Sequence, residues 1–239
     1  MRKQKERNSI VIIVAYVVLG IFSFMCIAPV VLMAVASFTD NDVLNLYGYT
    51  YFPQKWSLEA YEFLIKQGTV ISKSFLNSIL VTFMGTALGI MVTVLLAYTI
   101  SRKELVGRKL IMLFVFFTML FNGGMVPTYL MYTQIFHIKN TMWALLFPHL
   151  LVNGFNVLLV RTFFNENIPE VLLEAARIDG AGEISIFRNV VLPISKPILA
   201  TIGLLVGVGY WNDWYNGLLF VTDVNYYTLQ NFLNKITSR

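Results

Sequence analysis

The chain has 239 residues, of which 57% are hydrophobic and only 13% are charged, with a formal net charge of +5 and a mean hydropathy of +0.67. Soluble domains carry roughly 25% charged residues, so this composition excludes most soluble enzymes, disordered chains and nucleic-acid-binding domains. The single cysteine, Cys26, lies inside an apolar stretch, which excludes a disulfide scaffold. The composition predicts that lipid is the solvent of this chain.

Five apolar stretches are long enough to cross a membrane, which takes about 20 mainly apolar residues. They cover residues 11–37, 75–100, 110–132, 142–164 and 197–220. The first stretch resembles a secretory signal, since basic residues precede it and Ala34, Val35 and Ala36 follow the A-x-A pattern of a cleavage site. Its apolar part is about twice as long as that of a signal, which favours an uncleaved first helix.

Basic residues are shared unevenly between the segments that connect these stretches. Two-thirds of the 18 Lys and Arg residues lie in three places: before the first stretch, just after the second, and from the end of the fourth to the start of the fifth. By the positive-inside rule this asymmetry predicts a cytoplasmic N-terminus. The connection 39–74 is then external and suited to meeting a partner, with a short helical pattern near residues 58–65. The connection 165–196 is cytoplasmic, and the basic charge indicates topology rather than nucleic-acid binding.

The cytoplasmic connection predicts two short helices. Pro169 suits a first helical turn, residues 170–178 have a helical pattern, and Gly180 ends it. A second short helix covers residues 183–191 and ends before Pro193. The two helices and their turn are expected to lie across the membrane surface.

The first of these helices has a face suited to docking. Its positions at three- and four-residue spacing are Leu172, Ala175, Ala176 and Asp179. The paired alanines let another backbone approach closely. An amphipathic helix that rests on lipid headgroups fits the same pattern, and the residues alone leave both interpretations open.

A longer pattern runs through the same connection. It consists of Glu174, Ala175, Ala176, Gly180, Val190, Leu192 and Pro193. These residues and their spacing resemble the EAA loop of binding-protein-dependent ABC importer permeases, written E-A-A-x3-G-x9-I-x-L-P, with Val190 in place of the isoleucine. The match to so many fixed offsets favours docking over a helix that only rests on lipid.

Further segments resemble the maltose-type and multiple-sugar permeases of that family, and together they cover most of the chain from Phe75 onward. Around the EAA loop they are Arg161, Phe163, Phe164, Ile168, Pro169, Glu170, Ile178, Asp179 and Ala181. In the third stretch they are Asn122, Gly123, Gly124, Val126, Pro127 and Thr128, and in the fifth Tyr210, Trp211, Asn212, Asp213 and Trp214.

The resemblance implies an all-α membrane protein with the helical bundle of a type I ABC importer permease. The family core ends with a further span that returns the C-terminus to the cytoplasm, so the resemblance also implies a sixth span missing from these 239 residues. In this family the EAA helix inserts into a cleft on a cytoplasmic ATPase subunit. The coupling residues implied here are Glu174, Ala175, Ala176, Asp179 and Gly180.

The implied function is that of a permease subunit in an ATP-driven carbohydrate importer, which couples ATPase closure to alternating access. The chain has no G-x-x-x-x-G-K-[ST] phosphate-binding loop, so we expect neither enzyme activity nor a cofactor in it, and ATP on another subunit. The implied partners are two copies of a cytoplasmic ATP-binding subunit, a second related permease, an extracellular solute-binding protein, a carbohydrate and the lipid of a bacterial plasma membrane. A permease for a non-sugar solute is the alternative, and an ion-coupled secondary transporter or scaffold would leave the EAA pattern unexplained.

Polar residues inside apolar stretches are candidates for the substrate path, because they cost free energy in lipid and tend to face a bundle interior. The third and fourth stretches contain Asn122, His149, Asn153 and Asn156, the last three at spacings of four and three on one helical face. Helix packing is the alternative, since asparagine also forms hydrogen bonds across helices.

The fifth stretch contains a mixed aromatic and polar run, namely Tyr210, Trp211, Asn212, Asp213 and Trp214. Aromatic faces beside amide and carboxylate groups suit a sugar, whose C–H face stacks while its hydroxyls form hydrogen bonds. An aromatic belt at the membrane interface explains the same run without a substrate. The two histidines and the cysteine lie in separate segments, so the sequence predicts no metal site and no catalytic site.

Overall fold

The computed structural model describes residues 2–148 and 150–237, with side chains described from residue 11 onward. Regular structure in this part is helical, and the only strand-like pairing within it is an isolated bridge between Thr39 and Trp56. The prediction of an all-α fold is confirmed. Backbone contacts divide the chain into two compact units, Met1–Thr69 and Val70–Arg239.

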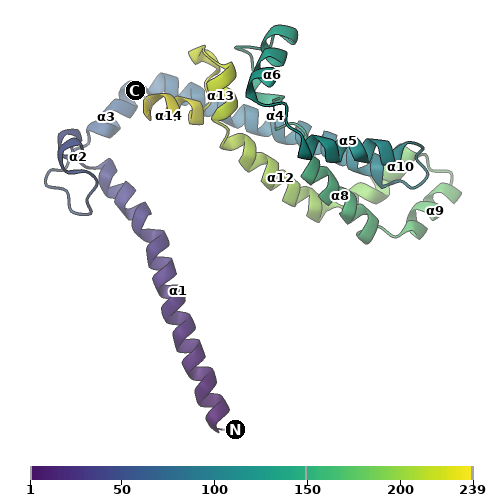
Figure 1. Cartoon of the computed structure of the whole chain (residues 1–239), viewed down its shortest axis with the longest axis horizontal. Helices are drawn as coiled ribbons and strands as arrows, with labels where there is room; N and C mark the ends of the chain where they lie inside the picture. Colours follow the sequence, from purple (N-terminus) through teal and green to yellow (C-terminus); the bar gives the residue numbers. More distant parts are fainter. Residues whose placement is uncertain (1, 149, 238–239) are drawn as a thin grey trace. The chain divides into compact units, whose positions relative to one another are not determined.

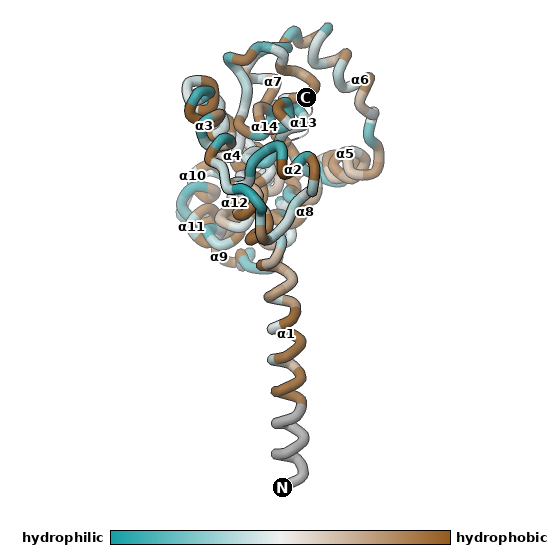
Figure 2. The backbone as a smooth tube through the Cα atoms, turned by 90° about the vertical axis from the view of Figure 1, so that its left-hand side faces the viewer, coloured by the Kyte–Doolittle hydropathy of each residue, from teal (hydrophilic) through white to brown (hydrophobic). Residues whose placement is uncertain are grey.

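The first unit begins with α1 (Arg2–Ser37), whose described side chains are mainly apolar and exposed all round the helix. Phe24 and Met33, for example, are 72% and 73% exposed. Figure 2 shows hydrophobic residues along most of the described part of α1. A helix with this distribution belongs in an apolar surrounding, and Val11–Ser37 is long and apolar enough to cross a membrane. The first predicted stretch is therefore a single helix.

The rest of the first unit contains α2 (Asn41–Tyr47) and α3 (Glu59–Lys66). Asp40 caps α2 by accepting a hydrogen bond at 3.1 Å from the backbone N–H two residues later. Its other carboxylate oxygen lies 2.6 Å from Lys55 Nζ, and the hydrogen bond from that ammonium holds the pKa of the Asp40 carboxyl below its usual range. The helix predicted near residues 58–65 is present one position later.

The second unit is built around α4 (Gly68–Ser101), against which α12 (Lys196–Trp211) packs closely. Gly85 permits this approach, because a Cβ there would lie 2.5 Å from the Tyr210 ring. Tyr210 is 2% exposed, and its hydroxyl donates a hydrogen bond at 2.7 Å to the carbonyl oxygen of Leu146. Figure 1 shows α8 (Gly154–Asn167) beside α12, and the core of the unit includes Val81, Val94, Ala97, Val157, Val160, Ile202 and Val206.

Three of the predicted stretches are broken. The stretch 110–132 contains α5 (Arg108–Leu120), α6 (Met125–Leu130) and the start of the π-helix η1 (Met131–Ile135). The stretch 142–164 contains α7 (Trp143–Leu146) and α8. The stretch 197–220 contains α12 and α13 (Tyr215–Phe220). A continuous helix in each stretch is therefore not observed. The cause is an Asn or Asp in each stretch whose side chain accepts hydrogen bonds from nearby backbone N–H groups.

By length and composition, α1 and α4 can each cross a membrane, and α4 contains the predicted stretch 75–100. Two bent pairs could add one span each. In the first pair α5 and the segment Met125–Ile135 meet at 114°, and in the second Glu183–Ile194 and α12 meet at 80°. The number of spans and their orientation stay predictions.

The C-terminal segment packs on the beginning of α4. It contains the short turn η3 (Val224–Tyr226) and α14 (Leu229–Thr237). Asn77 Nδ2 donates hydrogen bonds to two carbonyl oxygens of this segment, at 2.9 and 3.0 Å. The N–H of Leu229 donates to Ser78 Oγ at 2.8 Å. In Figure 1 α14 accordingly lies along α4.

Candidate functional site

The predicted coupling helix is α9 (Glu170–Ile178), whose bounds coincide with the range expected from the sequence. Pro169 precedes its first turn, and Leu173, 5% exposed, anchors it in the core. The helix ends because Gly180 adopts a left-handed conformation with φ +82°, which favours glycine. The N–H of Ala181 closes the turn by donating to the carbonyl oxygen of Ala176 at 2.9 Å.

The second helical segment of this connection continues past its expected end. It consists of α10 (Glu183–Ile186), the π-helix η2 (Phe187–Val191) and α11 (Leu192–Ile194). Pro193 does not end it, contrary to expectation. Pro193 lies at the second position of α11, directly after the π-helix η2, and the segment ends two residues later at Ser195.

Arg177 on α9 joins two carboxylates from different segments. Its guanidinium lies 3.0 Å from Glu104 Oε1 in the α4–α5 connection and 3.0 Å from Glu183 Oε1 at the start of α10. Glu183 also accepts a hydrogen bond at 2.7 Å from the Tyr98 hydroxyl of α4. The pKa of the Glu104 carboxyl is lowered, first by a hydrogen bond from its own backbone N–H and then by Arg177. These contacts tie the end of α9 to α4.

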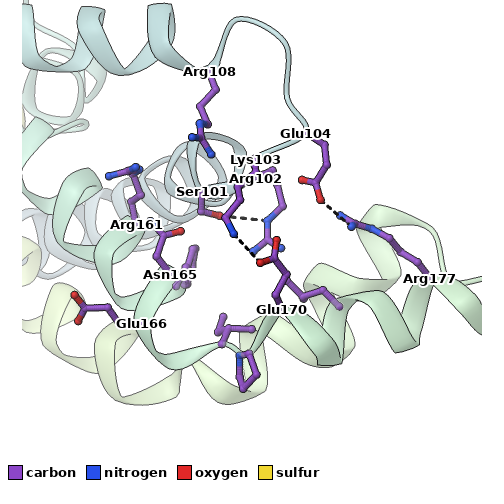
Figure 3. A pocket seen from close by; sticks show the side chains of 14 residues that line it. Ser101, Arg102, Lys103, Glu104, Arg108, Arg161, Asn165, Glu166, Glu170 and Arg177 are labelled. Atoms are coloured by element: carbon purple, nitrogen blue, oxygen red, sulfur yellow. Dashed lines mark hydrogen bonds and ion pairs between the residues drawn. The ribbon is translucent and has the colours of Figure 1, made fainter.

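A third ion pair holds the start of α9. Lys103 Nζ lies 2.7 Å from Glu170 Oε2 in the first turn of the helix, and Figure 3 shows this pair beside that of Glu104 and Arg177. Exposed ion pairs contribute roughly 0–1 kcal/mol each, so neither pair alone stabilises the fold strongly. Together they fix both ends of α9 relative to the α4–α5 connection.

The five predicted coupling residues lie together on α9 and its terminal turn. Glu174, Ala175, Asp179 and Gly180 are exposed, and Ala176 is half-buried against the core. Two apolar neighbours, Val171 and Ile178, are 70% and 85% exposed. The helix therefore presents small, acidic and apolar groups on a surface that the described residues leave uncovered.

Three of the candidate path residues accept backbone hydrogen bonds with their side chains at the breaks in the predicted stretches. Asn122 Oδ1 accepts a hydrogen bond at 2.9 Å from the N–H two residues later. Asn153 Oδ1 accepts two, at 2.9 and 3.3 Å, and Asp213 Oδ1 accepts two at 3.1 Å. Asn153 thus precedes α8 instead of sharing a helical face with Asn156, because its side chain replaces the missing helical partners. His149 lies outside the described residues.

The remaining candidates differ in their exposure. Tyr210 and Asn156 are 2% and 8% exposed, so they take part in packing. Trp211 is half-buried, with its ring centre 6.0 Å from that of Phe75. Asn212 is exposed and Trp214 is 46% exposed. The end of α12 and the start of α13 therefore offer one amide and one indole ring to a ligand.

The three helix breaks gather in one part of the second unit. Asn216 Nδ2 in α13 donates a hydrogen bond at 2.9 Å to the carbonyl oxygen of Pro148, which joins the second break to the third. Gly154 begins α8, and a Cβ at this position would lie 2.6 Å from Met119 of α5. This close approach brings the first break next to the second.

Two features of this region were not predicted from the sequence. One is an apolar cavity of about 480 Å³ beside the α7–α8 connection, lined by Tyr132, Phe136, Ile138, Phe147, Leu151 and Val152. The other is the group of partners around Arg177, namely Tyr98, Glu104 and Glu183. Of these partners, only Glu183 could be predicted from the sequence, because it lies six positions after Arg177 across a single turn.

Proteins of similar sequence are transport permeases. A family described as "Binding-protein-dependent transport system inner membrane component" matches residues 85–237. The polygalacturonan/rhamnogalacturonan transport system permease protein YtcP of Bacillus subtilis (strain 168) is 36% identical over 230 residues, which cover 96% of this chain and 79% of that protein. The trehalose/maltose transport system permease protein MalG of Thermococcus litoralis is 30% identical over 226 residues, which cover 93% and 79%.

A solved structure is similar over nearly the same range. It is the crystal structure of a bacterial ABC transporter involved in the import of the acidic polysaccharide alginate. One of its chains matches with a TM-score of 0.84 and 29% sequence identity, and the match covers 96% of this chain and 80% of that one. The similarity in fold therefore includes both compact units of the chain.

Proposed function

We propose an oligosaccharide as the cargo of this chain, from the premise that the chain belongs to the family of binding-protein-dependent transport system inner membrane components. It is a multi-pass permease subunit of an ABC importer, and the prediction of this family is confirmed. The family consists of permease subunits that are not catalytic themselves. Membership implies an ATPase and a binding protein as partners.

Within this permease, α9 is the element that docks on the cytoplasmic ATPase subunit. The observation that carries this part of the proposal is the exposed group of EAA residues on a helix whose two ends are held by ion pairs. A helix fixed in this way transmits a rigid-body movement of its partner to α4 through Glu183 and Tyr98. A helix that only rests on lipid headgroups would need no such anchors.

Gly180→Val tests the docking. Gly180 has φ +82°, which L side chains rarely adopt, although a Cβ there would meet nothing within 4 Å. The strain of roughly 1–2 kcal/mol displaces the turn without a clash. We expect the variant to reach the membrane but to lose both uptake and the ATPase in a pull-down from mildly solubilised membranes. The wild-type preparation should contain the ATPase and a second, related permease.

Gly182→Val is the matched control. Gly182 has φ −73° and equally open surroundings, so a side chain there causes no strain. This variant should keep the ATPase and transport normally. Normal uptake by Gly180→Val would overturn the docking role, and an equal loss in both variants would show that the conformation of the turn is not the cause.

The proposed cargo site lies at the helix breaks around Trp214. This exposed indole ring lies two positions after the exposed Asn212, so the same segment offers an aromatic face and an amide group. The relatives are named for the transport of polygalacturonan and rhamnogalacturonan and of trehalose and maltose, and the similar structure imports alginate. Both observations favour a carbohydrate over a non-sugar solute.

Trp214→Ala tests the cargo site. Loss of one stacking face weakens binding by roughly 0.5–1.5 kcal/mol, so we expect the KM of oligosaccharide uptake to rise about two- to tenfold with the complex intact. Phe83→Ala is the control, because Phe83 is 75% exposed on α4 and lies outside the breaks. Equal KM values in wild type and Trp214→Ala would contradict the cargo site and favour the alternative, in which Trp214 belongs to an aromatic belt at the membrane interface.

The arrangement of the complex follows from the distribution of basic residues. A cytoplasmic N-terminus places α9 on the side of the ATPase. The connection 39–74 and the residues beyond Phe220 then face the solute-binding protein outside. Two copies of the ATPase subunit and a second permease complete the transporter that we propose.

A further inference from the structure

A cavity of about 460 Å³ lies between the end of α4, the α4–α5 connection, the end of α8 and the start of α9. Figure 3 shows its side chains, and five basic and three acidic residues are among those that line it. The buried side chains of Phe164, Ile168 and Leu173 also belong to its lining. The cavity is thus a basic pocket behind the coupling helix, and the docking proposal uses only the two ion pairs in its lining.

The basic side chains of this pocket are only partly neutralised. Lys103 and Arg177 take up two of the acidic residues in the ion pairs described above. The other three basic residues, Arg102, Arg108 and Arg161, are half-buried. Among the described side chains, none of these three arginines forms an ion pair with a carboxylate.

The contacts of these arginines leave guanidinium N–H groups for a ligand. Arg161 Nε donates to a backbone carbonyl oxygen at 3.4 Å. Arg102 Nε donates to a serine hydroxyl at 3.3 Å, and its guanidinium carbon lies 4.5 Å from the centre of the Tyr98 ring. In Figure 3 Arg108 projects from the start of α5 toward the pocket, whereas the carboxylate of the exposed Glu166 points away from it.

A half-buried cation needs an anion or water to offset its desolvation. The planar guanidinium group binds phosphate oxygens in pairs, and several arginines around one pocket favour a phosphate-bearing anion over a single carboxylate. The ligand chemistry that fits this pocket is therefore that of a phosphate group.

The position of the pocket on the chain indicates where this phosphate comes from. Arg108 is the first residue of α5, and within this helix the apolar side chains that are more than half exposed begin two residues later with Leu110, at 58%. Val106, in the connection before α5, is also exposed, at 95%. Leu113 and Phe114 follow with 64% and 63% exposure. In a membrane permease this is the level at which acyl chains give way to headgroups, and basic pockets between helices at that level suit anionic headgroups.

We propose that this pocket binds the phosphate of an anionic phospholipid headgroup, held by Arg102, Arg108 and Arg161. The headgroup lies against Leu173, next to the Glu170 carboxylate that Lys103 neutralises, so it supports the coupling helix from the side opposite the ATPase docking surface. The proposal rests on the membrane location of the chain and is independent of the cargo. Loss of the headgroup would therefore leave the KM effect of Trp214→Ala unchanged.

The test uses the complete transporter, purified with this chain and incubated in mixed micelles with equal amounts of phosphatidylglycerol and phosphatidylcholine. Native mass spectrometry then measures which lipid stays bound. We expect the wild type to retain phosphatidylglycerol selectively, and each arginine removed in Arg108→Gln and Arg161→Gln to weaken retention about fivefold. Lys109→Gln is the matched control, because Lys109 is exposed and does not line the pocket, and it should retain the lipid.

Two further arms keep the result decisive. Arg108→Lys and Arg161→Lys preserve the charge and should retain most of the lipid, which separates anion binding from a purely structural role. Retention of the ATPase subunit reports that each variant is assembled. Equal retention by wild type and the double Gln variant would overturn the proposal, as would an equal loss in Lys109→Gln. Displacement of the lipid by millimolar inorganic phosphate would also overturn it, by assigning the pocket to a soluble anion.

Discussion

Arg177 is the residue on which the coupling mechanism depends most. It is the one side chain of α9 that contacts both the α4–α5 connection and α10 in the described part of the chain. The EAA residues that precede and follow it contact the partner in our proposal, whereas Arg177 acts inside the permease. It is therefore a positioning residue, and its loss should separate ATPase binding from transport.

Arg177→Gln is expected to leave the complex assembled but to lower the uptake obtained per ATP hydrolysed. Energetic coupling through such networks is worth roughly 0.5–2 kcal/mol, which corresponds to about a two- to thirtyfold loss. Uptake and ATPase activity measured together in proteoliposomes give this ratio. Arg188→Gln is the control, because Arg188 is exposed on η2 and forms no ion pair among the described side chains. An unchanged ratio in Arg177→Gln would remove Arg177 from the mechanism.

Single residues also show which contacts can be predicted from the sequence and which cannot. The EAA pattern indicated Glu174 and Gly180 correctly as neighbours on one short helix and turn, because their spacing alone determines that geometry. The partner Glu104 lies 73 positions before Arg177, and only the packing of α9 below the α4–α5 connection brings them together. A contact of this kind leaves no local pattern in a single sequence.

Among the elements, α4 and α12 pack against each other at a glycine. The ring of Tyr210 occupies the space that a side chain at Gly85 would need, and the hydrogen bond of its hydroxyl fixes the ring. This buried hydrogen bond joins α12 to α7, so the ring cannot move away from Gly85 without losing it. Gly85 thus sets the distance between the two helices.

Gly85→Ala should destabilise the purified transporter despite the higher helix propensity of alanine. Overpacking at a rigid ring costs about 1–3 kcal/mol, which exceeds the gain of about 1 kcal/mol from replacing a helical glycine. A lower thermal unfolding midpoint of the complex would show this. Gly20→Ala in α1 has nothing within 4 Å of its new Cβ and should lower the midpoint by no measurable amount. Equal midpoints for both variants would contradict the role of Gly85.

At this scale the sequence predicts unbroken elements better than broken ones. The bounds of α9 and the end of α1 follow from proline, glycine and the length of an apolar run. The breaks at Asn122, Asn153 and Asp213 were read from the sequence as polar groups within spans. Whether such a residue faces a path or caps a new helix depends on its backbone geometry, which hydropathy does not report.

Both units of the molecule expose large apolar surfaces, which need an apolar surrounding to cover them. α1 is exposed along its described length, and α5 exposes Phe114 and Phe117 at 63% and 54%. Lipid and a second permease are the surroundings that can cover such helices. The orientation of the chain in that lipid is the property that the basic residues predict.

Single cysteines test this orientation. In a Cys26→Ser background, Tyr49→Cys and Lys109→Cys each introduce one exposed thiol, the first in the connection 39–74 and the second at the start of α5. We expect a membrane-impermeant maleimide to label only Tyr49→Cys in intact cells and both variants after permeabilisation. Labelling of Lys109→Cys in intact cells would reverse the proposed topology.

Because the π-helix η2 lies in this segment, the number of residues between Gly180 and Val190 determines the direction in which the side chains of α10 face. An α-helix advances by about 100° per residue, and η2 already holds the extra residue that a π-helical turn accommodates, so inserting one more residue there would turn α10 by roughly that angle relative to α12. Glu183 would then face away from Arg177 and Tyr98 although each of them was still present. The nine positions left open in the EAA pattern should thus tolerate exchange of their residues but not an added residue.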